Sequence, residues 1–255
     1  MTDSAFWDDM AESYEAKAHP FFLLYARTML SRLNICPGVR FLDVATGTGA
    51  AALPAAELGA EVVAIDFSAK MIERLSARGV CNINAQQMDR QALMLPDTSN
   101  DVAVSLFGVM LFEDWNQGLR EMTRVTKPGG TVAIVTWKDP DGGGINQLIR
   151  QICRDVYPNI KLPPPSVSMT ELSDPERLTK ALRDAGLDSP QGVVLTEQYR
   201  FKLEQIFQGN PWSQRLTPNQ QQTVLEEVRR RFGKNRDGGN LYIESEALLA
   251  TAKRR

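Results

Sequence analysis

The sequence predicts an α/β fold with one doubly wound, mostly parallel sheet. Short apolar segments of strand length recur along the first half of the chain, at about residues 39–45, 61–66, 81–86, 101–107 and 131–137. Segments with helical periodicity separate several of them, near residues 49–59, 68–79 and 114–126. A glycine-containing turn follows the first apolar segment directly, as in sheets that bind a nucleotide at their strand ends. This alternation indicates parallel strands joined by helices.

Composition and charge exclude several classes of protein. Of the 255 residues, 43% are hydrophobic and 24% are charged, enough to bury a sizeable core without disulfides. No apolar stretch reaches about 18 residues, so we expect no membrane span. The N-terminus MTDSAFWDDM is acidic, which argues against a signal peptide and for a cytoplasmic protein. With a net charge of −2 and scattered Lys and Arg, we expect no nucleic-acid partner.

We interpret residues 1–255 as a single domain with three parts. Residues 4–33 carry two helical patterns with a break at His19, and we expect them to form a lid. Residues 39–137 form the core of alternating strands and helices. Residues 138–255 hold an insert with cap helices and two C-terminal strands.

The C-terminal part has weaker patterns than the core. The segment KLPPPSVSM, residues 161–169, is expected to be a link without a helix of its own. A helix then begins after Asp174 as N-cap and ends at Gly186. Two alternating segments predict the sixth and seventh strands, over residues 193–201 and 241–253. More helices are expected between these strands, over residues 201–213 and 216–232, where Phe207 and Trp212 either line a pocket or pack a satellite core.

The segment FLDVATGTGA, residues 41–50, is the most informative part of the chain. An apolar strand ends near Asp43, and Gly47 and Gly49 then allow backbone torsions and close ligand approach. The next strand ends at Asp66, seventeen residues after Gly49, where a carboxylate can accept both hydroxyls of a ribose. The same spacing satisfies the fingerprint of NAD-binding proteins, so the glycines alone leave the cofactor open.

Two further features narrow the choice. An acid lies four residues before Gly47, and the block RVTKPGGTVAIVTW, residues 124–137, places K-P-G-G between a helix and the fifth strand. With these motifs the chain resembles class I S-adenosylmethionine-dependent methyltransferases of the small-molecule branch, which includes enzymes of ubiquinone and menaquinone biosynthesis. The resemblance covers residues 5–137 well. It implies a Rossmann-like sheet of seven strands with an antiparallel seventh strand, N-terminal lid helices and a helical insert.

The resemblance implies a binding site for S-adenosylmethionine, with S-adenosylhomocysteine as the product. The family motif D-x-x-x-G-x-G places Asp43 in this site. Ala45, Thr46 and Gly47 would present their backbone to the methionine half of the cofactor. The helix that starts near Gly49 would direct its positive end toward the cofactor's carboxylate. Ala50 stands where the family loop often has a third glycine, a change that a first helical turn should tolerate.

The adenosine half of the cofactor has its own implied residues. Asp66 would hold the ribose hydroxyls, and Phe67 and Met71 would pack on the adenine with apolar surface. Asp89, in the loop after the third strand, would accept a hydrogen bond from the adenine amino group. The backbone of Arg90 would meet the neighbouring ring nitrogen.

Three other residues match family positions near the methionine half. Leu106 and Phe107, at the end of the fourth strand, would shape the space around the sulfonium. Tyr14, in the lid segment DDMAESYEA, would reach the cofactor's carboxylate with its hydroxyl. Each of these residues also has a structural alternative, since strand-end acids and apolar side chains are common in cores.

His19 is the one candidate for a general base in catalysis. A sulfonium methyl is already activated, so proximity supplies most of the catalysis, and a base is needed only if the acceptor must lose a proton. His19 is the only histidine of the chain and directly precedes Pro20. It either faces the acceptor or ends the first lid helix as a surface residue.

Three functions are compatible with the sequence. The first is methyl transfer to the O, N, S or C atom of a small-molecule acceptor, such as a secondary metabolite or quinone precursor. The second is a non-methylating reaction on the same fold, of the pericyclase or decarboxylase type, and the third is a nicotinamide-dependent oxidoreductase. The acceptor pocket would take a modest, largely uncharged molecule. Monomer and homodimer fit the sequence equally well.

The cysteines give no sign of a metal site or of disulfides. Cys36, Cys81 and Cys153 lie far apart without paired spacing. We expect them to be small buried side chains. A three-thiol site like that of arsenic methyltransferases, which share the fold, is the alternative.

Overall fold

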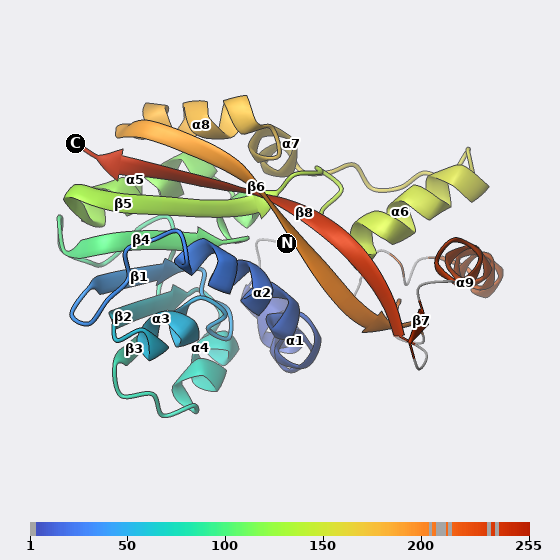
Figure 1. Ribbon diagram of the computed structural model, residues 1–255, viewed down its shortest axis with the longest axis horizontal. Coiled ribbons are helices and arrows are strands. Elements are labelled where there is room, and N and C mark those ends of the chain that lie inside the picture. The colour runs from blue at the N-terminus through green and yellow to red at the C-terminus, as the bar shows by residue number, and fades with distance from the viewer. Residues whose placement is uncertain (1–3, 204–205, 208–212, 214–215, 234–235, 238–239) are drawn as a thin grey trace.

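The protein is built around one mixed sheet (Figure 1). The computed structural model describes residues 4–203, 206–207, 213, 216–233, 236–237 and 240–255. Seven strands follow the order β3-β2-β1-β4-β5-β8-β6, and a two-residue strand, β7, pairs with β8. Their bounds are β1 (Arg40–Val44), β2 (Glu61–Asp66), β3 (Ile83–Gln87), β4 (Asn100–Leu106), β5 (Thr126–Trp137), β6 (Leu187–Lys202), β7 (Arg236–Asp237) and β8 (Asn240–Arg254). The predicted seven-stranded doubly wound sheet is confirmed, with β7 as an unpredicted addition.

The strand directions agree with the predicted topology. β1 to β5 are parallel to their neighbours, whereas β8 is antiparallel to both β5 and β6. β1 and β4 lie inside the sheet, and their residues are buried on both faces, including Phe41, Leu42 and Val104. β3 lies at an edge, and its residues Asn84 and Gln87 are exposed. The inner strands are therefore the ones with continuous apolar runs.

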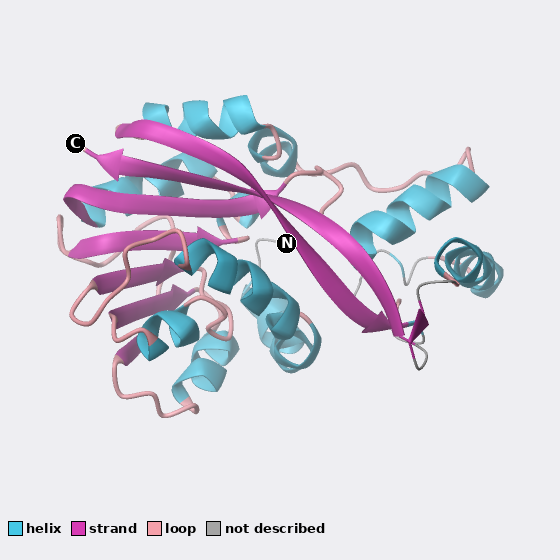
Figure 2. Ribbon diagram, in the orientation of Figure 1, coloured by secondary structure: helices cyan, strands magenta, loops and turns pink. Residues whose placement is uncertain are grey.

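Helices cover both faces of the sheet (Figures 1 and 2). The helices are α1 (Ser4–Lys17), α2 (His19–Leu30), α3 (Ala52–Glu57), α4 (Ala69–Ser76), α5 (Trp115–Val125), α6 (Ile145–Val156), α7 (Val167–Leu172), α8 (Pro175–Asp184) and α9 (Pro218–Phe232), with a 3₁₀ turn, η1 (Val109–Leu111). In Figure 1, α2 and α3 cross the near face, while α5 and α8 lie on the far face. Among the described residues, no helix combines the length and apolarity required to cross a membrane.

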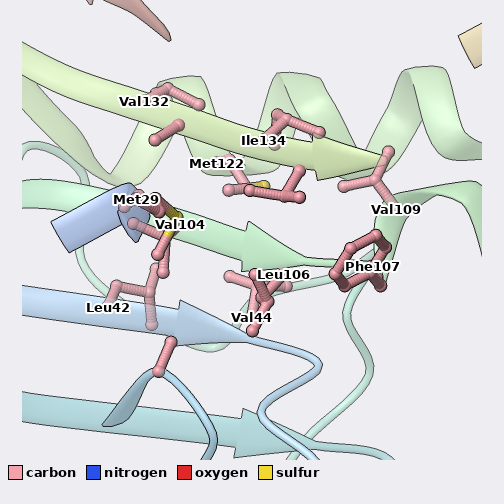
Figure 3. Packing of buried hydrophobic residues seen from close by; sticks show 14 of the residues in the cluster. Met29, Leu42, Val44, Val104, Leu106, Phe107, Val109, Met122, Val132 and Ile134 are labelled. Carbon is pink, nitrogen blue, oxygen red and sulfur yellow. The ribbon is translucent and has the colours of Figure 1, made fainter. Parts of the chain in front are cut away.

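The main core lies between the sheet and these helices (Figure 3). Met29 of α2 and Leu42 of β1 are fully buried on one side of the inner strands. Met122 of α5 and Ile134 of β5 are equally buried. Figure 3 shows Phe107 directly beyond the end of β4, so the core reaches the edge where the strands end. This packing fixes the position of the strand ends.

β6 and β8 continue well beyond the sheet as a long antiparallel ribbon (Figure 1). A second cluster of apolar residues, here called the satellite cluster, packs there. Its members come from α6, α9 and the far ends of both strands. Ile149 and Ile152 of α6, Val228 of α9 and Leu241 of β8 are its buried centre. Phe207 packs against this cluster, which supports the satellite-core alternative for that residue.

Several C-terminal elements differ from the sequence prediction. A helix, α7, begins at Val167 inside the segment expected to be only a link, because Ser166 caps it by accepting the Met169 N–H. The helix expected over residues 201–213 is wrong at its start, because Phe201 and Lys202 are the last residues of β6, and Trp212 lies outside the described residues. The predicted N-cap of α8, Asp174, is confirmed.

The expectation of buried cysteines holds for one residue. Cys153 lies in the satellite cluster on α6, where burial raises the pKa of its thiol to about 11. Cys36 and Cys81 are exposed, because they belong to the turns that precede β1 and β3. The prediction of burial is therefore wrong for Cys36 and Cys81.

Candidate active site

A cavity of about 550 Å³ opens at the carboxyl ends of the parallel strands. This is the edge where open α/β sheets bind their ligands. Nine predicted site residues line it: Tyr14, Ala45, Gly47, Asp66, Phe67, Met71, Arg90, Leu106 and Phe107. Five do not: His19, Asp43, Thr46, Gly49 and Asp89. The structure thus brings most of the predicted site together.

The loop after β1 owes its shape to residues with positive φ. Gly47 has a φ of 56°, and a Cβ there would lie 3.1 Å from the ring and hydroxyl of Tyr14. Gly49 has a φ of 93°, and a Cβ would lie 2.5 Å from Cδ1 of Leu75. Gly47 therefore keeps the cavity open, whereas Gly49 serves packing beneath it. Ala45 also adopts a positive φ, of 60°, which is strained for a residue with a side chain.

Asp43 organises this loop from below. Its carboxyl is 1% exposed, and its Oδ2 accepts a hydrogen bond of 2.7 Å from the Thr46 hydroxyl. Its Oδ1 is buried without a hydrogen-bond partner. Burial raises the pKa of Asp43 to about 7, although Thr46 and the Ala52 backbone oppose the shift. Asp43 and Thr46 thus shape the loop without lining the cavity.

Asp66 is the acid that faces the cavity. It ends β2, and its Oδ2 accepts a hydrogen bond of 2.9 Å from the Gly47 N–H. Its Oδ1 accepts one of 3.0 Å from the Ser68 N–H. Burial raises the pKa of this carboxyl, while the backbone donors and the charge of Arg90 lower it. Two backbone N–H groups therefore fix the orientation of this carboxylate at the carboxyl end of β2.

The helix α1 closes one side of the cavity with Trp7 and Tyr14. Burial and the nearby Asp66 and Asp43 raise the pKa of Tyr14, which keeps its hydroxyl protonated and available as a donor. Asp8 accepts hydrogen bonds from the Ser68 hydroxyl and the Lys70 N–H at the start of α4.

An ion pair adds a second attachment of α1 to α4. Glu15 pairs with Arg74 and with Arg78, each at 2.5 Å. Together with Asp8, this places the predicted lid over the cavity by contacts with α4.

His19 is neither a surface residue nor part of the cavity lining. It is 8% exposed and begins α2. Its Nδ1 lies 2.8 Å from the hydroxyl of Thr48 in the loop after β1. Burial lowers the pKa of its imidazole. The surface alternative is therefore wrong, and the geometry points to a role in positioning the loop.

Asp89 and Arg90 lie differently from what the family resemblance implied. Asp89 is exposed and borders a separate hollow of about 460 Å³. The side chain of Arg90, for which the sequence implied only a backbone role, is 6% exposed. Its guanidinium carbon lies 3.9 Å from the ring centre of Phe67 and 5.0 Å from that of Phe112. The two acids assigned to one ligand thus border different hollows, and Arg90 borders both.

Aromatic side chains fill the middle of the cavity wall. Phe107, which has a φ of 57°, packs against Trp137 with 4.0 Å between ring centres. Phe22 of α2 packs on Phe107 at 5.1 Å. Figure 3 shows Leu106 and Phe107 at the end of β4, as the sequence predicted. Trp137 and Phe22 were missed as site residues, although Trp137 ends the predicted fifth strand.

The insert supplies a polar wall that the sequence did not predict. Asp141 and Arg150 form an ion pair of 2.8 Å, with side chains 9% and 8% exposed. Arg154 pairs with the other oxygen of Asp141, and Arg150 donates a hydrogen bond to the carbonyl of Pro163. Helical periodicity gave no signal for this pair, because it places Arg150 on the polar side of α6, away from Ile149 and Ile152.

Comparisons with known proteins identify the family to which this chain is related. A family model described as a methyltransferase domain matches residues 42–134. A demethylmenaquinone methyltransferase of Renibacterium salmoninarum is 31% identical over 161 residues, which cover 62% of this chain and 68% of that protein. An uncharacterised protein of Mycobacterium bovis is 36% identical over 131 residues, covering 50% of this chain and 45% of that protein. The chain thus spans less than half the length of this second relative.

Solved structures of low identity share the fold. A putative methyltransferase from Bacillus halodurans has a TM-score of 0.59 at 17% identity, over 90% of this chain and 98% of that one. A [4+2]-cyclase has a TM-score of 0.52 at 18% identity, over 91% of this chain and 80% of that one. The strand order, the loop after β1 and the sequence relatives agree. The chain belongs to the class I S-adenosylmethionine-dependent methyltransferase family.

Proposed function

We propose that this protein transfers the methyl group of S-adenosylmethionine to a small-molecule acceptor. The observation that carries the proposal is the carboxylate of Asp66, which two backbone N–H groups hold at the end of β2, facing the cavity. A fixed carboxylate at this position suits the two hydroxyls of a ribose. Membership of the methyltransferase family supports the same ligand.

The lining residues fit S-adenosylmethionine. Asp66 would hold the ribose, and the backbone of Ala45 and Gly47 would border the methionine half. The protonated hydroxyl of Tyr14 lies against Gly47, where it would donate to the cofactor's carboxylate. A Cβ at Gly47 would intrude into this space. When bound, the cofactor supplies an activated sulfonium methyl, and the protein aligns the acceptor with it.

The rest of the cavity would receive the acceptor. Phe22, Phe107 and Trp137 offer flat apolar surface, and the pair of Asp141 and Arg150 offers hydrogen-bonding groups at the wall of the insert. We infer an aromatic acceptor with a polar edge. The relatives named demethylmenaquinone methyltransferase support a quinone precursor as one such acceptor.

A second candidate is a reaction that uses the bound cofactor only for its charge. The described lining of the cavity contains no His, Cys, Lys or Glu side chain. A site with few bases suits an acceptor that needs no deprotonation, and it suits a pericyclic step equally well. A protein named a [4+2]-cyclase shares this fold, which supports the second candidate.

Product mass separates these candidates. The purified protein is incubated with S-adenosylmethionine carrying a trideuterated methyl group and a panel of phenols, quinols, amines and thiols. We expect S-adenosylhomocysteine and a product heavier than its acceptor by one trideuterated methyl group in place of hydrogen. Conversion of a substrate without that mass gain supports the second candidate. If the protein binds the cofactor but neither result occurs with the natural acceptor, methyl transfer is contradicted.

A further inference from the structure

Arg90 and Phe67 separate two hollows in the surface. The cavity of about 550 Å³ is bordered by Asp66, and the second hollow, of about 460 Å³, by Asp89. Phe67 and Arg90 line both. Their side chains therefore form the partition between the acid at the end of β2 and the acid in the loop after β3.

The guanidinium of Arg90 is held by two aromatic rings and by the charge of Asp66, and one of its nitrogens lacks a hydrogen bond. It stacks near the rings of Phe67 and Phe112, at 3.9 Å and 5.0 Å. Its Nε is buried and has no hydrogen-bond partner. A charged donor without a partner is unfavourable in a buried place, whereas contact with an aromatic face offsets only part of that cost. Part of the cost of burying this cation therefore stays uncompensated in the free protein.

The resting place of the Arg90 side chain lies where a nucleobase would be expected if Asp66 binds a ribose. A base is bonded directly to its ribose, so it must lie next to the group that binds the ribose hydroxyls. Phe67 follows Asp66 in the chain and presents its ring to the guanidinium. A flat guanidinium and a flat heterocycle stack on an aromatic face in the same manner.

The structure also offers Arg90 a second location. Asp89 and Glu113 border the second hollow, and both are exposed. Burial lowers the pKa of the Arg90 guanidinium, and the charges of Asp66, Asp89 and Glu113 oppose that shift. Moving outward would bring the cation into water and toward two carboxylates.

We propose that the side chain of Arg90 occupies the adenine subsite of the free protein and leaves it when the adenosine part of the cofactor binds. The partition then opens, and the cavity and the second hollow become one site that spans Asp66 and Asp89. This inference rests on the proposed function, because it takes S-adenosylmethionine as the ligand. In the free protein, the side chain of Arg90 would therefore compete with adenine for this subsite.

Calorimetry with S-adenosylhomocysteine tests the competition. Removing the competitor in Arg90→Ala should tighten binding by about 2- to 30-fold, the equivalent of a cation–π contact. Arg120→Ala is the matched control, because it removes the same charge from the exposed face of α5 and should leave affinity unchanged. Thermal unfolding shows that each variant is folded. Unchanged or weaker binding by a folded Arg90→Ala overturns the proposal.

Nuclear magnetic resonance tests the displacement itself. The ring current of Phe67 should shift the Nε–H signal of Arg90 in the free protein, and Arg90→Lys identifies the signal by its loss. Addition of S-adenosylhomocysteine should move the signal to the region of solvent-exposed arginines. A signal that keeps its shift in the saturated complex overturns the displacement. If the wild type binds no S-adenosylhomocysteine, the proposed function fails first, so the two failures are distinguishable.

Discussion

The two walls of the cavity are held in different ways. On the strand-end wall, Asp66 accepts hydrogen bonds from the backbone of the same sheet edge, including that of Gly47. On the insert wall, Asp141 is held by two arginine side chains, and Arg150 by the carbonyl of Pro163. The first wall is determined by local sequence features, namely apolar strand segments, the turn after β1 and the torsions of its glycines. The second depends on pairing between side chains of a separate segment.

The two walls should also differ in their stability against local opening. The strand-end wall rests on the main core, whereas α6 packs on the satellite cluster with α9 and the far ends of β6 and β8. Regions with a small separate core open more readily than central strands. The insert wall should therefore open without unfolding of the sheet, which would let the proposed acceptor side of the cavity change while the proposed cofactor side stays fixed.

Breaking the buried ion pair should have the largest effect. Arg150→Ala leaves Asp141 with only the half-exposed Arg154, and it should lower the free energy of opening α6 by about 3–5 kcal/mol. Hydrogen exchange of α6 amides measures this loss. Arg154→Ala is the control, since a half-exposed partner contributes about 1 kcal/mol or less. Equal loss of protection in β1 and β4 would show that the two walls form one cooperative unit.

The buried carboxyl of Asp43 should make the strand-end wall sensitive to pH. Its pKa is about 7 in the folded protein and 3.8 in the reference state. Between these values the folded protein keeps a proton that the unfolded chain has lost, so this contribution to stability falls as pH rises and levels off above about 7. From pH 5 to 7, the wild type should lose up to about 2 kcal/mol relative to Asp43→Asn.

Urea unfolding at several pH values measures this difference between the wild type and Asp43→Asn. A constant difference across the range would mean that Asp43 is ionised throughout. The loop after β1 would then hold a carboxylate rather than a protonated acid.

Loss of His19 should affect stability more than turnover. His19→Ala leaves the hydroxyl of Thr48 without its partner, which should cost about 1–2 kcal/mol in the free energy of unfolding. Turnover of the natural acceptor at saturating substrate should change by less than about threefold, because His19 does not line the cavity. A loss of about 10²-fold in a folded variant would instead identify His19 as a general base.

The smallest effect is expected at the attachment of the lid. Glu15→Gln removes the charge that pairs with Arg74 and Arg78, and it should weaken the packing of α1 on α4 by about 1 kcal/mol or less. Hydrogen exchange of α1 amides should rise. Glu12→Gln is the control, because Glu12 is 87% exposed and lies 3.8 Å from Arg74. If both variants behave alike, the ion pairs of Glu15 do not hold the lid.

Sequence reasoning was most successful where local chemistry decides the structure. The strand ends, next to Asp43 and at Asp66, and the turn at Gly47 follow from apolar runs and from backbone torsions that favour glycine. The cap at Asp174 is equally local. The helix beginning at Val167 was missed because the three prolines before it dominated the pattern.

Side-chain contacts between separate elements lay beyond sequence reasoning. Arg150 meets Asp141 across nine residues, and the contact of His19 with Thr48 spans twenty-nine. The resemblance assigned Arg90 a role through its backbone alone. Only tertiary packing shows that its side chain lies on Phe67. Contacts of this kind depend on how elements meet and not on residue pattern.

Ligand binding at Asp66 tests the central claim most directly. We would titrate the wild type and Asp66→Ala by calorimetry with S-adenosylmethionine, S-adenosylhomocysteine and NADH. The wild type should bind the first two on the order of micromolar and should not bind NADH. Asp66→Ala should weaken binding by about 10²-fold or more, because two charge-assisted hydrogen bonds are lost. Binding of NADH alone, or equal affinity in a folded Asp66→Ala, would contradict the claim that the strand-end wall is the cofactor site.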